Sequence, residues 1–143
     1  MFVTTTRWRW GEGSPELKYL LAMYLNPDVM AGLSEQEMDG IMTGHQEFIR
    51  TIRESGEMIG TQALAPVADS SVVRVRGGLP AITDGPFLES KEFLAGYYLV
   101  DVENKERALE LAAMIPDAAI DGLAVEVREI VFFADAESAI PGS

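Results

Sequence analysis

Residues 82–98 read ITDGPFLESKEFLAGYY, and this stretch decides how the chain is interpreted. Its Asp-Gly-Pro tripeptide at residues 84–86 predicts a tight turn, because Asp bonds to nearby backbone, Gly accepts positive φ and Pro fixes its own φ. The segment that follows, residues 93–101 (FLAGYYLVD), is rich in aromatic and aliphatic residues and predicts a strand. Gly96 within it indicates either that another backbone approaches closely or that the strand bends there.

Just before this turn, two short segments predict a β-hairpin. Residues 71–76 (SVVRVR) alternate in character and are rich in valine, which favours a strand. Gly77 and Gly78 then lead into residues 79–83, and two glycines between strand segments are typical of a hairpin turn.

Further out, the chain predicts two helices. The first begins at Ser34, because Ser34 and Glu37 match a capping box, and it ends near Gly56. The second covers residues 105–115. Its sheet-facing positions are expected to be Ala108, Leu109, Ala112 and Ile115.

Three more strands are expected at residues 17–25, 58–64 and 123–131. The order is then β–α–β–hairpin–β–α–β. This order predicts an α+β, ferredoxin-like split βαβ fold with an inserted hairpin, in which two helices cover one face of an antiparallel sheet.

The other sheet face is predicted to need a cover. Tyr24, Tyr97, Tyr98 and Leu99 make the sheet too apolar for one face to remain in water. Because the chain predicts no third helix to cover it, a second copy is the simplest cover, and we expect a two-fold homodimer. A ligand bound in the cleft between the copies could cover part of the same face.

The length of 143 residues and the 48% hydrophobic content fit one domain with a sizeable core. We expect a flexible or docking N-terminal tail at residues 1–16, the domain at residues 17–131, and a C-terminal tail at residues 132–143. Trp8 and Trp10 lie two residues apart in the first tail and could dock onto the domain or onto a partner chain.

Composition excludes several classes of function. The net charge of −12 disfavours nucleic acid and anionic membranes as partners. With one histidine and no cysteine, the chain predicts no thiolate chemistry, no disulfide and no ordinary zinc site.

The chain also carries no P-loop or Rossmann glycine pattern, so no cofactor is expected. Because no apolar run is long enough to span a bilayer and no secretory signal is evident, a cytoplasmic location is expected.

Residues 82–98 also closely resemble a family signature. The signature is TDGPF-x-E-x-K-E-x-L-x-G-Y-Y, from the YciI-related DGPF proteins. The likeness extends over about residues 17–131 and includes residues 18–24, the Gly60 to Pro66 segment, and the Val-Arg pairs within residues 73–76 and 125–128.

The resemblance implies a ferredoxin-like fold that pairs into a dimeric α+β barrel. It implies no particular substrate. Some YciI-like relatives act on small aromatic molecules with a His and an Asp as a suspected acid–base pair. Many DGPF proteins are encoded beside alternative sigma factors. This implies an association with those factors that rests on the neighbouring position of the genes.

His45, the only histidine, lies on the apolar stripe of the first helix. One interpretation makes it a general acid or base, since histidine changes protonation near neutral pH and the YciI-like relatives carry a histidine on this helix. Asp84 would then orient His45 or hold a substrate proton. The other interpretation makes His45 a hydrogen-bonded packing residue and Asp84 a turn residue.

Four further residues are candidates for substrate binding. Arg74 and Arg76 share one face of a strand and, with Arg128, could hold a carboxylate or phosphate; alternatively, they form a solvated edge paired with acidic residues. Phe87 is expected to fill the core or the dimer interface. Since Tyr97 and Tyr98 point to opposite faces of their strand, one of them, here taken as Tyr98, is expected to line the cleft.

Two classes of function remain open. The dimer is an enzyme, or a degenerate one, that binds or transforms a small organic molecule, an aromatic one among the candidates, with His45 and Asp84 moving protons. Alternatively, it is a non-catalytic ligand-sensing or regulatory module, linked to a partner such as an alternative sigma factor.

Overall fold

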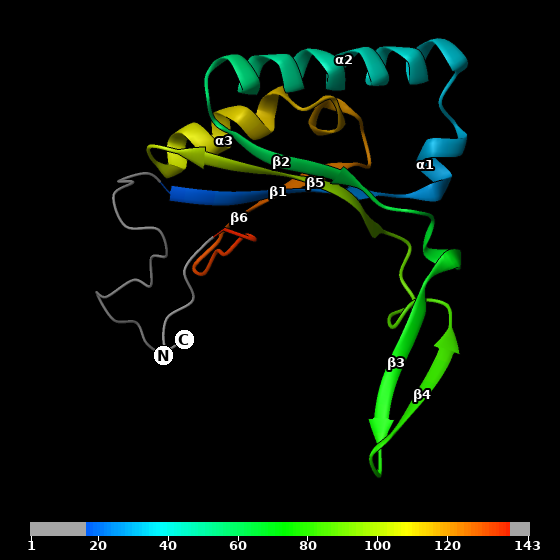
Figure 1. Ribbon diagram of the computed structural model, residues 1–143. Coiled ribbons are helices and arrows are strands. Elements are labelled where there is room, and N and C mark those ends of the chain that lie inside the picture. Colours follow the sequence, from blue (N-terminus) through cyan, green and yellow to red (C-terminus); the bar gives the residue numbers. More distant parts are fainter. Residues whose placement is uncertain (1–16, 138–143) are drawn as a thin grey trace.

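The computed structural model describes residues 17–137, so the predictions for Trp8 and Trp10 lie outside the described residues. The described chain is an α+β fold, as predicted (Figure 1). Its strands are β1 (Leu17–Leu25), β2 (Met58–Ala63), β3 (Ser71–Arg76), β4 (Leu79–Asp84), β5 (Phe93–Val102) and β6 (Ala124–Glu129). Its helices are α1 (Pro27–Ala31), α2 (Glu35–Glu54) and α3 (Lys105–Met114), with short 3₁₀ turns η1 (Val67–Asp69) and η2 (Pro116–Ala119).

Four strands form an antiparallel sheet in the order β2-β5-β1-β6. Helices α2 and α3 lie on one face of this sheet (Figure 1). Over the described residues the sheet does not close into a barrel within one chain. The two predicted helices are confirmed, whereas α1 and both 3₁₀ turns were not predicted.

Helix α2 begins and ends as its sequence predicts. Ser34 caps the helix: its hydroxyl accepts from the Glu37 backbone N–H at 3.0 Å, and the Glu37 carboxylate accepts from the Ser34 N–H at 2.8 Å. This capping box satisfies two backbone donors that the helix itself leaves open. After the helix ends, Gly56 adopts a φ of 79°, a conformation that glycine accepts without strain.

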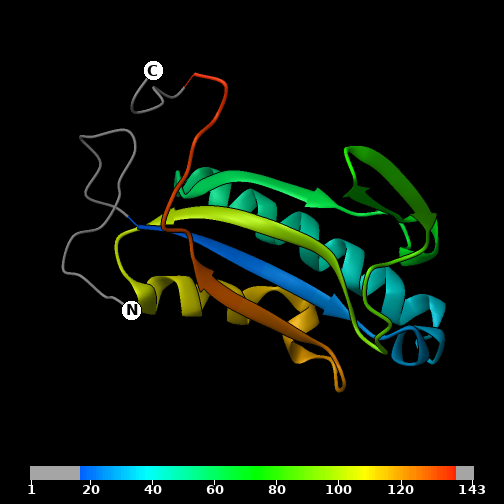
Figure 2. The same cartoon turned by 90° about the horizontal axis from the view of Figure 1, so that it is seen from below.

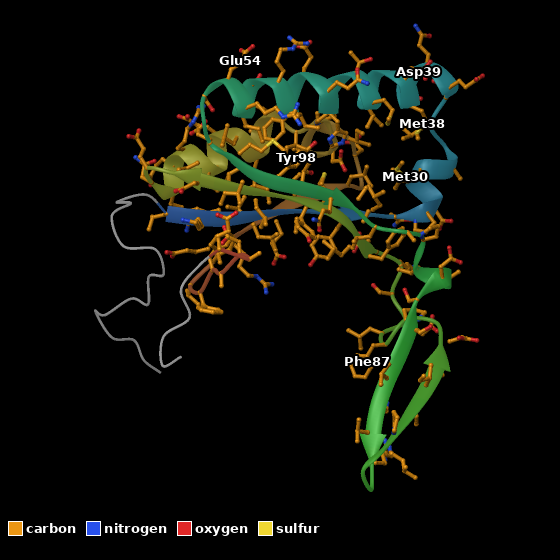
Figure 3. The ribbon with its side chains drawn as sticks, in the orientation of Figure 1. Met30, Met38, Asp39, Glu54, Phe87 and Tyr98 are labelled. Carbon is orange, nitrogen blue, oxygen red and sulfur yellow. The ribbon has the colours of Figure 1, made fainter. Side chains whose placement is uncertain are left out.

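The core lies between the sheet and the two long helices. Alternate residues of the central strands are buried there, and Phe48 and Ile52 of α2 pack against them. Helix α3 contributes Leu111, which is fully buried, whereas Leu109 is 46% exposed. The prediction that Leu109 faces the sheet is therefore wrong. Figure 3 shows Tyr98 in this layer, between the sheet and α2.

The opposite face of the sheet carries half-buried apolar side chains. Leu20 of β1 is paired with Leu99 of β5, and the next pair on that face is Ala22 with Tyr97. Because side chains alternate along a strand, these residues point away from the core. No helix within residues 17–137 covers this face, which we call the open face (Figure 1).

Strands β3 and β4 form a separate two-stranded sheet, so the predicted hairpin is confirmed. It extends away from the four-stranded sheet on the side opposite to α2 and α3 (Figure 1). Seen from below the sheet, it stands beyond one end of the long strands (Figure 2).

Gly96 of β5 lies where the backbone of β2 approaches closely. A Cβ atom there would lie 2.7 Å from the Gln62 carbonyl oxygen of β2. Real Cβ atoms do not approach backbone this closely, so of the two predicted reasons for Gly96 the close backbone approach is confirmed.

Candidate functional site

His45 of α2 lies in a three-residue network between the helices and the sheet. Its Nδ1 lies 2.7 Å from the Tyr98 hydroxyl of β5, and its Nε2 lies 2.9 Å from the Asp117 Oδ1 of η2. Tyr98 and Asp117 are 2% and 4% exposed, and the His45 side chain is 22% exposed. We call these three side chains the His45 network.

The chemistry of the three groups fixes the direction of both hydrogen bonds for a neutral imidazole. The Asp117 carboxylate is an acceptor, so the Nε2–H donates to it. Nδ1 is then the acceptor for the Tyr98 O–H. Both ring nitrogens are therefore bonded to protein groups.

A glycine allows the network to form. Gly44 of α2 precedes His45, and Pro116 of η2 precedes Asp117. A Cβ atom on Gly44 would overlap the Cγ of Pro116. Because Gly44 has no side chain, η2 approaches α2 closely enough for Asp117 to reach His45.

We expect Gly44→Ala to lower the free energy of unfolding by about 1–3 kcal/mol, because the new methyl group must displace Pro116. Gly40→Ala, one turn earlier in α2, is the matched control, since a Cβ atom there meets nothing within 4 Å. In a helix interior, that change is expected to stabilise the protein by about 0.5–1 kcal/mol. Urea denaturation measures both effects. Equal stabilisation by the two alanines would contradict the claim that a side chain at Gly44 displaces Pro116.

The network resembles the carboxylate–imidazole–hydroxyl arrangement that activates nucleophiles, but its hydroxyl is not activated. Activation requires a hydroxyl that loses its proton readily and that a substrate can reach. Burial of the Tyr98 hydroxyl, and then the negative charge of Asp117, raise the pKa of Tyr98 to about 12. The arrangement is thus suited to holding η2, α2 and β5 together.

The raised pKa of Tyr98 predicts a loss of stability at alkaline pH. The folded pKa is about 12 and the ordinary value is 10.0, so the unfolded chain releases this proton first. The contribution is complete below pH 10 and is lost as the pH rises from 10 towards 12, by up to about 2–3 kcal/mol.

Tyr98→Phe is expected to remove this alkaline loss, so the stability difference between parent and variant should shrink between pH 10 and 12. Denaturant midpoints at several pH values provide the measurement. Tyr97→Phe, on the open face, controls for the removal of a tyrosine hydroxyl as such. If the stability difference between the parent and Tyr98→Phe stayed constant up to pH 12, the raised pKa of Tyr98 would not be the cause of the alkaline loss.

Asp84 does not contact His45 within one chain. Asp84 is an exposed residue at the end of β4, and the β3–β4 hairpin lies on the opposite side of the sheet from α2 (Figure 1). The carboxylate bonded to His45 belongs to Asp117, which the sequence analysis did not single out. A catalytic pair of His45 and Asp84 stays a prediction.

The other sequence candidates fall into three places: the core, the hairpin and strand β6. Tyr98 faces the core, whereas Arg74, Arg76 and Phe87 lie on or beside the hairpin. The Arg74 guanidinium lies 5.3 Å from the centre of the Phe87 ring. Phe87 is 68% exposed, which excludes the first of its two expected places, the core of its own chain, and leaves the dimer interface a prediction (Figure 3). Arg128 is paired with Glu126 at 3.1 Å.

A cavity of about 480 Å³ opens at the end of the sheet where β1 ends and β6 begins. The Tyr24 hydroxyl donates to the Glu126 carboxylate at 3.3 Å beside it. The cavity is open to solvent, and most of its lining residues are exposed. The cavity is lined by Tyr24, Glu92, Gly122, Leu123, Ala124, Val125 and Glu126.

Residues 17–137 show neither a metal-binding cluster nor a membrane-spanning helix. No three His, Asp or Glu side chains in that range come together as a metal site. Among the same residues, no helix has the length and apolar character needed to cross a membrane.

The comparisons with known proteins agree with the resemblance noted in the sequence. The family model for the YCII-related domain matches residues 17–134. The chain is also 28% identical, over 119 residues, to a Rhizobium meliloti (strain 1021) protein named "Uncharacterized protein R00369". That alignment covers 83% of this chain and 96% of the relative. The chain therefore belongs to the YCII-related domain family.

Proposed function

We propose that the protein is a homodimer that binds a small aromatic molecule, neutral or positively charged, in the cavity beside Tyr24. The observation that carries the proposal is the uncovered, half-buried apolar surface of the open face, with the cavity at its end. Apolar surface of this kind is stabilised when a second protein surface removes it from water.

The strand order supports this arrangement. With the hairpin left aside, the order β2-β5-β1-β6 corresponds to the split βαβ, ferredoxin-like topology. Such a sheet has helices on one face and needs a cover on the other. Two open faces packed together would form the dimeric α+β barrel that the resemblance implies.

The lining of the cavity favours one ligand charge over the other. Tyr24 supplies an aromatic ring and Leu123 an aliphatic wall. Glu92 and Glu126 place two carboxylates at the same cavity, and these repel an anion and attract a cation. The anion site expected around Arg74 and Arg76 lies elsewhere, on the hairpin.

His45 has a different role in this proposal. It lies on the helix side of the sheet, and the cavity is lined by Tyr24 and Glu126, whose side chains belong to the open face. A substrate at the cavity therefore meets the carboxylates and not the imidazole. Binding, rather than acid–base catalysis by His45, is the activity that we assign to this site.

Titration with two ligands of matched shape tests the proposal. We expect benzylammonium to bind about tenfold more tightly than benzoate, because the two carboxylates favour the cation. Glu126→Gln should reduce this preference, whereas Glu106→Gln, on the exposed first turn of α3, should leave it unchanged. Chemical-shift changes of residues around Tyr24 report the binding.

Benzoate binding as tightly as benzylammonium would contradict the assigned ligand charge. If neither compound saturates a site at Tyr24, the cavity is not an aromatic-binding site. The dimer is tested separately, by the mass of the protein in solution.

A further inference from the structure

One face of the β3–β4 hairpin is apolar over its two outer residue pairs, with Ser71 and Asp84 on the same face at its base. Val73 pairs with Ile82, and Val75 pairs with Pro80, so the four side chains share one face of the two-stranded sheet. Val73, Val75 and Ile82 are 62%, 67% and 70% exposed within one chain. We call these four residues the hairpin face.

The other side of the hairpin carries its two basic side chains. Arg74 and Arg76 alternate with the two valines and therefore point the opposite way, on the face that also holds Val72, Leu79, Ala81 and Thr83. Arg74 lies against the ring of Phe87. Within residues 17–137 no second layer covers the hairpin face (Figure 1).

A two-stranded ribbon of this kind is not stable on its own in water, because it needs a hydrophobic face packed on another layer. An exposed row of β-branched residues is also prone to aggregation. Pro80 removes one backbone N–H from β4, which disfavours extension of the sheet at that edge. The face of the ribbon, rather than its edge, is therefore the surface that packs.

We propose that the β3–β4 hairpin is an arm that packs its hairpin face, Val73, Val75, Pro80 and Ile82, against a second copy of this chain. This inference rests on the homodimer of the proposed function. It adds a second contact beyond the open face.

The position of the arm and its charge both favour a second copy. The hairpin extends on the same side of the sheet as the open face, where the second copy would lie (Figure 1). The strands of the arm carry Arg74, Arg76 and one acidic residue, Asp84, whereas the whole chain has a net charge of −12. Its two arginines are attracted to the acidic surface of another copy.

Two neighbouring substitutions on β4 test the inference. Ile82→Lys places a charge on the hairpin face, and Thr83→Lys places the same charge on the opposite side of the same strand. Both positions are exposed in a single chain, so neither change should disturb the core. Sedimentation equilibrium of the full chain gives the dimer dissociation constant, and circular dichroism checks that each variant is folded.

We expect Ile82→Lys to raise the dissociation constant by about tenfold or more, because a charge would replace an isoleucine that becomes buried when the proposed dimer forms. Thr83→Lys should change it by less than about threefold. If the parent is a dimer and Ile82→Lys leaves the constant unchanged, or if both lysines weaken it equally, the arm proposal is overturned while the homodimer stands. If the parent is a monomer at every concentration, the homodimer itself fails.

Discussion

His45→Ala is expected to lower the free energy of unfolding by about 3 kcal/mol. Asp117 is 4% exposed and its carboxylate accepts a hydrogen bond from His45. Without the imidazole, the buried carboxylate and the Tyr98 hydroxyl each lose a hydrogen bond, and such losses are among the largest that single substitutions cause. Urea denaturation near neutral pH measures the change.

A double-mutant cycle separates the energy of the contact between His45 and Asp117 from the effect of removing either side chain alone. His45→Ala and Asp117→Ala, made together, should cost less than the sum of the two single changes by about 1–3 kcal/mol, since the pair is already broken by either one. Gln46→Ala, at the exposed neighbouring position, is the control and should cost less than about 0.5 kcal/mol. Additive single changes would show that the two side chains are not coupled.

The second large effect concerns the dimer. Leu99→Glu is expected to weaken self-association at least about 100-fold, equivalent to roughly 3 kcal/mol, because a carboxylate on the open face would be buried without a partner. Leu99 lies opposite Leu20 in the middle of that face. Size-exclusion chromatography with light scattering, over a range of protein concentrations, gives the mass.

Leu109→Glu serves as the matched control for this change. It makes the same substitution on α3, where Leu109 is already 46% exposed on the helix side of the sheet. The control should remain as dimeric as the parent. If Leu99→Glu also remained dimeric, the two copies would have to meet through some other surface.

The secondary structure was largely predictable, because local signals in the sequence agree with one another. Ser34 and Glu37 form the predicted capping box, and the Gly77-Gly78 pair lies between two paired strands. Gly96 marks a close backbone approach. These features depend on residues close together in the sequence or on the absence of a side chain at glycine, and both can be seen in the sequence itself.

The face of α3 could have been predicted from helical spacing, and the expectation of Leu109 misapplied it. Counting i, i+3, i+4 and i+7 from Ala108 gives Leu111, Ala112 and Ile115. All four of these residues are buried, whereas Leu109, which falls outside this series, is 46% exposed.

The His45 network was only half predictable. The sequence singled out His45 and Tyr98, but it assigned the carboxylate to Asp84 because that residue opens the signature turn. Asp117 lies 72 residues from His45 and is one of 23 acidic residues. The one local hint is Pro116, which follows α3 and begins the 3₁₀ turn η2. Its ring packs against α2 at Gly44, where a side chain would block the contact.

The most direct test of the account is the mass of the full chain by sedimentation equilibrium, in parent and Leu99→Glu. The account predicts twice the 15.6 kDa of one chain for the parent, and 15.6 kDa for the variant at the same concentration. A parent that sediments as a single 15.6 kDa chain at all concentrations would contradict the proposed pairing of the open faces.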